Sequence, residues 1–123
     1  MVYRPLEALS QAEIDNIIER NQLEELMLLP LSVGEYHSNW KYAQQICVKL
    51  CEHEHASIRA NAVLGFGYIA RTKGCLEKHI VKPLILRELR SNPEHFGRIM
   101  DAISDINLYM DWQIGKHATN IDR

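Results

Sequence analysis

The feature that most constrains the fold of this chain is a helical pattern that occurs twice, about 40 residues apart. Each copy contains two stretches in which apolar residues recur at the spacing of one face of an α-helix. A shift of about 40 residues places Ile46 on Ile85, Leu50 on Leu89, Ala62 on Ala102, Val63 on Ile103 and Phe66 on Ile106. Two-helix units that repeat in this way stack into a solenoid, in which each unit packs on its neighbours.

The repeat and the signals at helix ends predict how the chain is organised. We expect helices at about 39–52 and 57–72 in the first pair, and at about 80–90 and 93–112 in the second. The predicted organisation is a single domain over residues 1–123, with N-terminal capping helices at 1–37, helical pairs at 38–74 and 75–112, and a tail at 113–123 that is frayed. Because no segment alternates as a β-strand does, the predicted fold class is all-α, a short helical-hairpin solenoid of about six to seven helices.

Individual residues mark where the expected helices begin and end. Ser10 and Glu13 form a capping box, in which each side chain satisfies a backbone N–H of the other residue. Gly74 is placed to end a helix in the left-handed conformation. An earlier helix is expected to end at Pro30, and the segment after it is interpreted as a break. The expected N-caps of the later helices are Ser38, Ser57 and Asn92.

The stretch HASIRANAVLGFGYIAR contains Gly65 and Gly67 in G-x-G spacing, which raises the question of a phosphate-binding loop. A dinucleotide-binding fingerprint needs a third glycine and a position between a strand and a helix. Both glycines lie instead inside a helical pattern, where each costs about 1 kcal/mol relative to alanine. We therefore expect two helix backbones to pack closely at Gly65, which would offset that cost.

The sequence does not predict a metal site, a cofactor or an enzyme. The run CEHEH, from Cys51 to His55, contains zinc-ligand types, but no second Cys/His pair follows at zinc-finger spacing. A polar turn between helices accounts for it. No nucleophile motif, paired catalytic carboxylates or H-E-x-x-H motif is found. We expect no catalytic residues, no cofactor and no bound metal.

Composition points to the compartment and limits the partners. The formal net charge of −2 and the isoelectric point near 6.3 argue against a nucleic-acid binder. Cys47, Cys51 and Cys75 have no disulfide-framework spacing, which fits a reducing compartment. No signal peptide or membrane span is found. The expected protein is cytoplasmic, with no membrane, nucleic-acid or small-molecule partner.

The segment SIRANAVLGFGYIA resembles the second helix of a HEAT repeat, which has the approximate pattern V-R-x-x-A-x-x-A-L-G-x-I. The matching places are filled by Ile58, Arg59, Ala62, Phe66, Gly67 and Ile69. The resemblance covers residues 38–112 and implies a short HEAT-like solenoid. The family has an aspartate six residues before the arginine, where this chain has His53. Ile99 stands where Arg59 would map in the second pair, so the family's Asp–Arg ladder is not expected.

The last helix places acidic and aromatic residues away from its apolar face, at i, i+4, i+8 and i+11. The matching face of the preceding pair adds three residues, and equivalent second helices of a solenoid line one surface. The resulting candidate partner-binding residues are Asn61, Leu64, Tyr68, Asp101, Asp105, Tyr109 and Trp112. Aromatic anchors with carboxylates around them suit a basic protein partner. The alternative is that the acids are simply solvated and the aromatics pack within the fold.

A compact HEAT-like chain of this size resembles the α-helical immunity proteins of bacterial polymorphic toxin systems, including contact-dependent growth inhibition. The resemblance implies a cytoplasmic 1:1 inhibitor that binds a cognate toxin, a basic nuclease domain, and covers its active-site cleft.

Two other functions are consistent with a helical repeat. One is a nucleic-acid-binding protein similar to HEAT-like DNA glycosylases, which would need a basic concave surface; the other is a peptide-binding scaffold module. The cations available for the former are Arg59, Arg71, Lys73, Lys78, Lys82, Arg87, Arg90 and Arg98.

Overall fold

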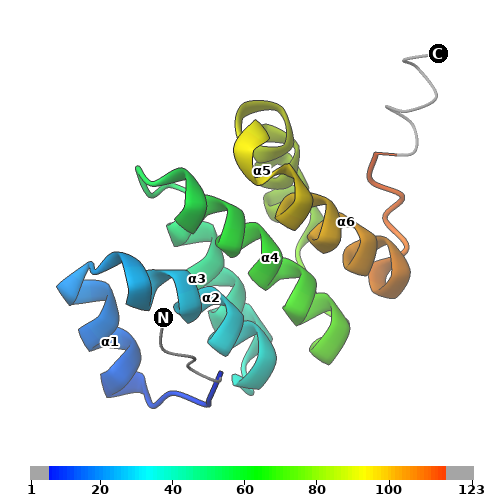
Figure 1. Cartoon of the computed structure of the whole chain (residues 1–123). Coiled ribbons are helices and arrows are strands. Elements are labelled where there is room, and N and C mark those ends of the chain that lie inside the picture. The colour runs from blue at the N-terminus through cyan, green and yellow to red at the C-terminus, as the bar shows by residue number, and fades with distance from the viewer. Residues whose placement is uncertain (1–5, 116–123) are drawn as a thin grey trace.

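The computed structural model describes residues 6–115, and all regular structure within this range is helical (Figure 1). The elements are α1 (Gln11–Arg20), α2 (Leu23–Tyr36), α3 (Trp40–Leu50), α4 (Ala56–Lys73), α5 (Lys78–Ser91), the short 3-10 helix η1 (Pro93–His95) and α6 (Phe96–Met110). The prediction of an all-α chain with about six to seven helices is therefore confirmed.

Helices α2, α4 and α6 form one layer, in which α4 lies between the other two (Figure 1). Near the start of these helices, the Asn61 side chain donates to the Met27 carbonyl oxygen at 2.7 Å, and Arg98 Nη1 donates to Asn61 Oδ1 at 2.7 Å. Near the end of α4, Thr72 Oγ1 donates to the Gly34 carbonyl oxygen at 2.9 Å. Because early residues meet early residues and late residues meet late ones, the three helices run parallel.

Helices α3 and α5 form a second layer behind the first. Gln44 of α3 and Glu77, the residue before α5, exchange two hydrogen bonds of 2.8 Å. At the other end, Arg87 of α5 donates to the Cys51 carbonyl oxygen at 2.6 Å and to Glu52 Oε1 at 2.8 Å. These contacts show that α3 and α5 are parallel as well. We call the α2–α4–α6 layer the inner layer and the α3–α5 layer the outer layer. Each outer helix forms a pair with the inner helix that follows it in the chain, α3 with α4 and α5 with α6.

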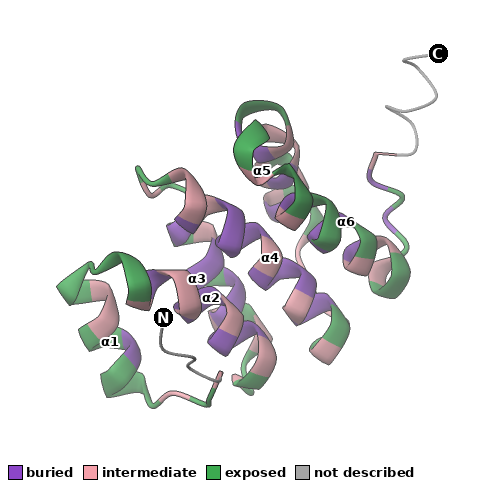
Figure 2. Ribbon diagram, viewed as in Figure 1, coloured by how far each residue is buried: buried purple, intermediate pink, exposed green. Residues whose placement is uncertain are grey.

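Helix α4 is the centre of the core, and it is buried along most of its length (Figure 2). Phe66 and Ile69 are completely buried, and they continue into one apolar core with residues of all the other α-helices. Because α4 is covered by α2, α3, α5 and α6, small and apolar residues occur around most of the helix and are not confined to one face.

Two glycines allow the neighbouring helices to approach α4 closely. A Cβ at Gly65 would lie 2.7 Å from Cys47 Sγ and 2.9 Å from the Pro30 carbonyl oxygen. A Cβ at Gly67 would lie 3.1 Å from the Ala102 Cα. The predicted close packing of helix backbones at Gly65 is confirmed, and Gly67 makes a similar contact on the side of α6.

The predicted break after Pro30 is wrong, because α2 continues through this proline to Tyr36. A proline inside a helix removes one backbone hydrogen bond and crowds the preceding turn. Here Pro30 itself, Leu29 and Val33 are all buried in the contact with α4. Packing on both sides of the proline therefore keeps the helix intact, which is a tertiary effect that the local sequence does not reveal.

The helix-end predictions are partly confirmed. Ser10 and Glu13 form the capping box, with bonds of 2.9 and 3.1 Å, and Gly74 ends α4 with a φ of 64°. The expected caps Ser38 and Ser57 are wrong by one or two residues, since the N-caps are Asn39 and His55.

Asn92 is the N-cap residue of η1, as expected, and Pro93 follows it, but the Asn92 side chain makes no cap hydrogen bond; it donates its amide to the Ala56 carbonyl oxygen at 2.8 Å. It therefore links the end of α5 to the start of α4.

The first residues of the predicted tail are packed on the fold. The Asn107 side chain forms two hydrogen bonds with the backbone of Ile114. It accepts from the Ile114 N–H at 2.7 Å and donates to the Ile114 carbonyl oxygen at 2.9 Å. Ile114 is buried. The remainder of the tail that was expected to fray, residues 116–123, lies outside the described residues.

We predict that Gly65→Ala lowers the free energy of unfolding by about 1–3 kcal/mol, because the new methyl group overlaps α2 and α3. The matched control is Gly97→Ala in α6, where an added Cβ meets no atom within 4 Å. The control is neutral or stabilising by up to about 1 kcal/mol. Denaturant unfolding of the two variants measures both values, and equal stability of the two would contradict the close approach at Gly65.

Candidate partner-binding surface

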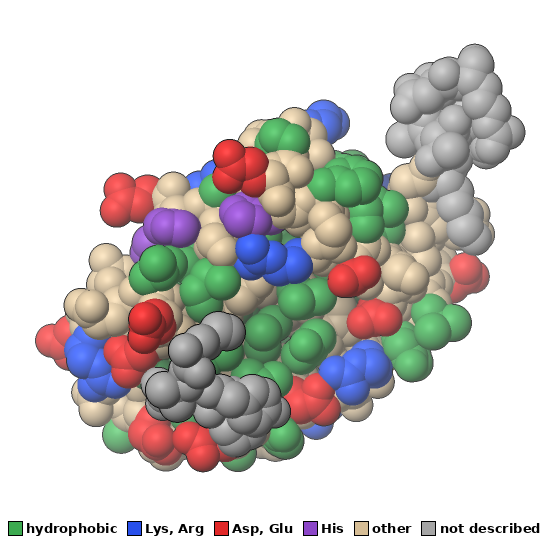
Figure 3. Space-filling model, in the orientation of Figure 1, with side chains coloured by type: hydrophobic (Ala, Val, Ile, Leu, Met, Phe, Trp, Pro, Cys, Tyr) green, Lys and Arg blue, Asp and Glu red, His purple; other side chains and the backbone are tan. Residues whose placement is uncertain are grey.

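Figure 3 shows the face of the α2–α4–α6 layer that points away from α3 and α5. Five of the seven predicted binding residues lie on α4 and α6 of this layer and are not buried. Apolar side chains gather in the middle of this face, with charged groups around them (Figure 3). Asp101 and Tyr109 of α6 are exposed, and Leu64, Tyr68 and Asp105 are half-buried. We call these five residues the acidic–aromatic face.

Two of the seven predicted residues do not reach this surface. Asn61 is only 6% exposed, because it lies where α2, α4 and α6 meet and its amide is bonded to Met27 and Arg98. Trp112 is 8% exposed. The i+11 spacing that placed it with Asp101 assumed a continuous helix, but α6 ends at Met110 and Asp111 adopts a left-handed φ of 54°.

An arginine that sequence reasoning did not assign to this surface lies within it. Arg71 forms an ion pair with Glu35 of α2, and its guanidinium lies 5.0 Å from the centre of the Tyr68 ring. The hydrogen bond that Arg71 donates to Glu35 raises the pKa of Arg71, with a further contribution from the charge of Asp105. Arg71 therefore joins Glu35, Tyr68 and Asp105 into one electrostatic cluster across three helices.

The N-terminal end of this layer is held by Arg98. Its Nη1 donates to Ser57 Oγ at 3.1 Å as well as to Asn61, and its Nη2 lies 2.7 Å from His95 Nδ1. Because a guanidinium can only donate, His95 Nδ1 must accept, which requires a neutral imidazole. Burial lowers the pKa of His95, and the positive charge of Arg98 lowers it further.

A buried carboxylate connects the two layers. Glu88 of α5 accepts from Arg59 Nε at 3.1 Å, from Arg87 Nε at 3.1 Å and from Asn92 Nδ2 at 3.2 Å. Arg59 Nη1 also donates to the carbonyl oxygens of His53 and of the next residue, both at 2.9 Å. His53 stands where a HEAT repeat has the aspartate that pairs with the arginine. Arg59 pairs with Glu88 of α5 in this chain, and the pair joins α4 to α5.

The cysteine and the two histidines of the CEHEH run belong to the turn between α3 and α4. Cys51 is buried, and burial raises the pKa of its thiol to about 12. His53 Nε2 lies 3.0 Å from Asn21 Oδ1, and His55 caps α4 by accepting from the Ser57 N–H. Within residues 6–115, no three His, Cys, Asp or Glu side chains are grouped to hold a metal ion.

The cations of the nucleic-acid alternative do not form a basic patch on the α2–α4–α6 face. Arg59, Arg71 and Arg87 are paired with glutamates, and Arg98 is bonded to Ser57 and Asn61. The remaining cations of α5, Lys78, Lys82 and Arg90, lie in the outer layer. No helix of the described chain is long and apolar enough to cross a membrane.

Fold and surface together define a stack of helical pairs with one acidic–aromatic face. No protein-family model and no curated protein matches this sequence. A solved structure does have this fold: a chain in the crystal structure of a CDI complex from Cupriavidus taiwanensis LMG 19424. The likeness has a TM-score of 0.73 at 22% sequence identity, and it covers 89% of this chain and 97% of the other.

We predict that Glu88→Ala lowers the free energy of unfolding by about 3–5 kcal/mol, because it leaves Arg59 without its partner in a partly buried position. Glu52→Ala is the control, since this carboxylate also binds Arg87 but its side chain is 61% exposed. Its expected loss is below about 1 kcal/mol. Thermal and denaturant unfolding measure the loss of stability in both variants. A loss in Glu88→Ala no larger than that in Glu52→Ala would contradict the role of Glu88 in joining the two layers.

The lowered pKa of His95 predicts a loss of stability in acid. The folded state favours the neutral ring, so this contribution is complete above about pH 6.5 and is lost as the pH falls through the lower folded value. The charged or titratable groups around the ring are Arg98, Glu94, His55 and Arg59.

His95→Asn keeps an acceptor near Arg98 but does not titrate, so its stability falls less than that of wild type between about pH 7.5 and about pH 5. The other five histidines are present in both proteins, and their contributions cancel in the comparison. Denaturant unfolding across this range measures the difference, and superimposable pH curves would contradict the neutral state of His95.

Proposed function

We propose that this chain is an immunity protein of a contact-dependent growth inhibition system, which binds a cognate toxin domain and neutralises it. The observation that carries the proposal is the likeness to a chain crystallised in a CDI complex, where CDI is read as contact-dependent growth inhibition. The match covers 97% of that chain, so it extends to the whole fold and is not limited to one shared helical pair. We also propose that the stacked pairs are divergent HEAT-like repeats.

The interface in this proposal is the acidic–aromatic face. Tyr109 is 47% exposed and supplies an apolar ring with a hydroxyl, the combination that is enriched at the centres of interfaces. Asp101 and Asp105 lie on the same side of α6, and Glu35 adds a third carboxylate near them. Arg71 neutralises only part of this charge. The remaining negative charge suits a basic partner and would speed its association.

The finer features of the proposal follow from this charge. A nuclease domain has a basic cleft because it binds phosphates, and the acidic–aromatic face would cover such a cleft in a 1:1 complex. The proposed site of action is the cytoplasm, where the substrates of such a toxin are found. Asn61 has a supporting role in this proposal, since it is buried where α2, α4 and α6 meet, whereas the buried Trp112 lies against Lys78 of α5.

The direct test uses a cognate toxin domain, sought in the reading frames next to the gene for this chain. The domain is expressed from an inducible promoter, with and without this chain, and growth is followed. The proposal expects arrested growth with the toxin alone, restored growth with both, and a 1:1 complex in size-exclusion chromatography. Arrested growth in the presence of the folded chain, with no complex formed, would reject the proposed function.

The interface is tested by Asp101→Lys combined with Asp105→Lys, which we expect to weaken toxin binding by about 100-fold or more, because it reverses two charges opposite a basic surface. The control is Glu7→Lys with Glu19→Lys, which makes the same change in net charge on exposed residues before and within α1. Calorimetry gives the affinities and circular dichroism verifies that both variants are helical. Equal weakening in both would show an effect of net charge alone and would remove this face from the proposal.

A further inference from the structure

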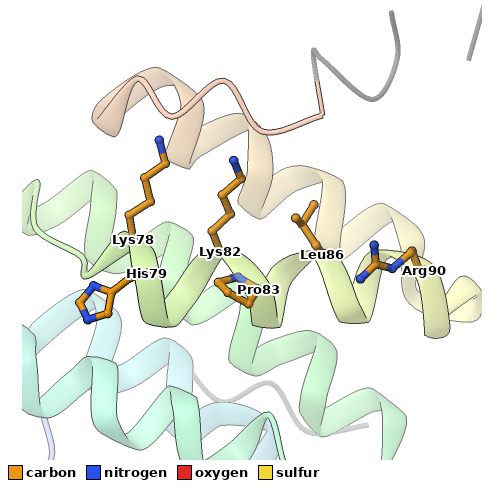
Figure 4. Close-up of a pocket in the computed structure, with 6 residues that line it drawn as sticks. All are labelled: Lys78, His79, Lys82, Pro83, Leu86 and Arg90. Atoms are coloured by element: carbon orange, nitrogen blue, oxygen red, sulfur yellow. The ribbon is translucent and has the colours of Figure 1, made fainter. Parts of the chain in front are cut away.

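A second charged surface lies along α5, in the outer layer and separate from the acidic–aromatic face. It is a groove with a volume of about 620 Å³, which we call the basic groove. Its lining residues are Lys78, His79, Lys82, Pro83, Leu86 and Arg90 (Figure 4). Lys78, Lys82 and Leu86 project from one side of α5 and His79 from the other (Figure 4).

The groove cations have a regular spacing. Lys78, Lys82, Leu86 and Arg90 follow one another at intervals of four, the spacing that places residues on one face of a helix. With a rise of about 1.5 Å per residue, the charged row extends for about 18 Å. That length corresponds to five or six residues of an extended peptide or about three turns of a helix.

The positive charge of the groove is not neutralised by the described part of the chain. Glu88 is the only acidic residue of α5, and it is buried against Arg87 and other groups inside the fold. Two nearby acidic residues pair with other cations, Glu52 with Arg87 and Glu77 with Lys41. None of the groove cations forms an ion pair with a residue between 6 and 115. Most other arginines of this range do form ion pairs, so the groove is where unpaired cations gather.

The groove also has an apolar component. Pro83 is exposed and Leu86 half-buried, and both lie between Lys82 and the cation at the end of the row. Lys78 is positioned over the buried Trp112, with its Nζ 5.8 Å from the ring centre. The surface therefore offers cations on both sides of an apolar patch, with one of the cations held in place by an aromatic ring.

From this arrangement we propose that the basic groove binds an acidic, amphipathic segment of a protein partner. Carboxylates of the segment pair with Lys82 and Arg90, and an apolar side chain packs on Leu86. A protein fits better than a nucleic acid, because single-stranded nucleic acids bind to exposed aromatic rings and the ring here, Trp112, is buried. The termini of this chain lack the complementary charge: residues 1–5 contain one arginine, and residues 116–123 contain two basic residues and one acidic residue.

The test is fluorescence anisotropy with the full-length protein at low ionic strength, about 50 mM salt, where exposed charges are weakly screened. The probe is a labelled synthetic peptide of about 12 residues with glutamates on one helical face and leucines on the other. A labelled single-stranded oligonucleotide of about 20 nucleotides is the second probe. We expect the peptide to bind in a salt-dependent manner, and Lys82→Glu with Arg90→Glu to weaken it by about tenfold or more.

The matched control is Lys49→Glu with Lys73→Glu, which reverses two charges on exposed lysines of α3 and α4. We expect it to bind the peptide within about twofold of wild type.

Failure of the peptide to bind, or equal weakening in the control, would overturn the proposal. Tighter binding of the oligonucleotide would assign the groove to nucleic acid. A dimer in ultracentrifugation that Lys82→Glu with Arg90→Glu dissociates would assign it to a second copy. Neither result bears on toxin neutralisation, which is measured separately.

Discussion

The contact between helix backbones around α4 is the interaction on which the rest of the structure depends. Gly65 and Gly67 each cost about 1 kcal/mol of helix propensity relative to alanine. In return, α2 and α6 approach α4 so closely that Pro30 and Ala102 lie against its backbone. This close approach fixes the spacing of the inner layer. The side chains on the exposed face of this layer are therefore carried by closely packed helices.

The periodicity of the sequence was sufficient to predict the helical class, because it depends on residues near one another in the chain. Close packing at Gly65 could be predicted because a glycine inside a helical pattern is unfavourable without it, but the partners Pro30 and Cys47 could not. The interactions that were missed join residues far apart. Helix α2 continues through Pro30 because of packing on α4, where the contact residue Gly65 lies more than thirty residues later in the chain. Asn61 was placed on the surface by its helical position, but bonds to Met27 and Arg98 bury it.

The candidate site shows the same division between local and long-range effects. Tyr68, Asp101 and Asp105 could be assigned to one side of the layer from helical spacing alone. The cluster around Arg71 could not, because its ion pair with Glu35 crosses from α4 to α2. Trp112 was misplaced since the left-handed conformation of a single residue, Asp111, ends the helix before it. An aspartate is tolerated in this conformation, but the sequence does not require it.

The net charge of −2 conceals two surfaces of opposite sign. Carboxylates and tyrosines project from the inner layer, whereas unpaired lysines and an arginine line α5 in the outer layer. The buried Arg59–Glu88 pair lies between these layers. This separation lets one small domain present different charges in different directions, so a basic partner is attracted to one layer and repelled by the other.

Hydroxyl-radical footprinting of the complex with the proposed toxin partner tests the central claim most directly, because the chain contains two tyrosines of matched exposure. Tyr109 on α6 and Tyr36 at the end of α2 are exposed to almost the same extent, 47% and 48%. If the acidic–aromatic face is the binding surface, the toxin protects Tyr109 from oxidation more strongly than Tyr36, which is not one of the five residues of that face. A complex in which Tyr109 stays as reactive as in the free protein would place the interface elsewhere and contradict the assignment.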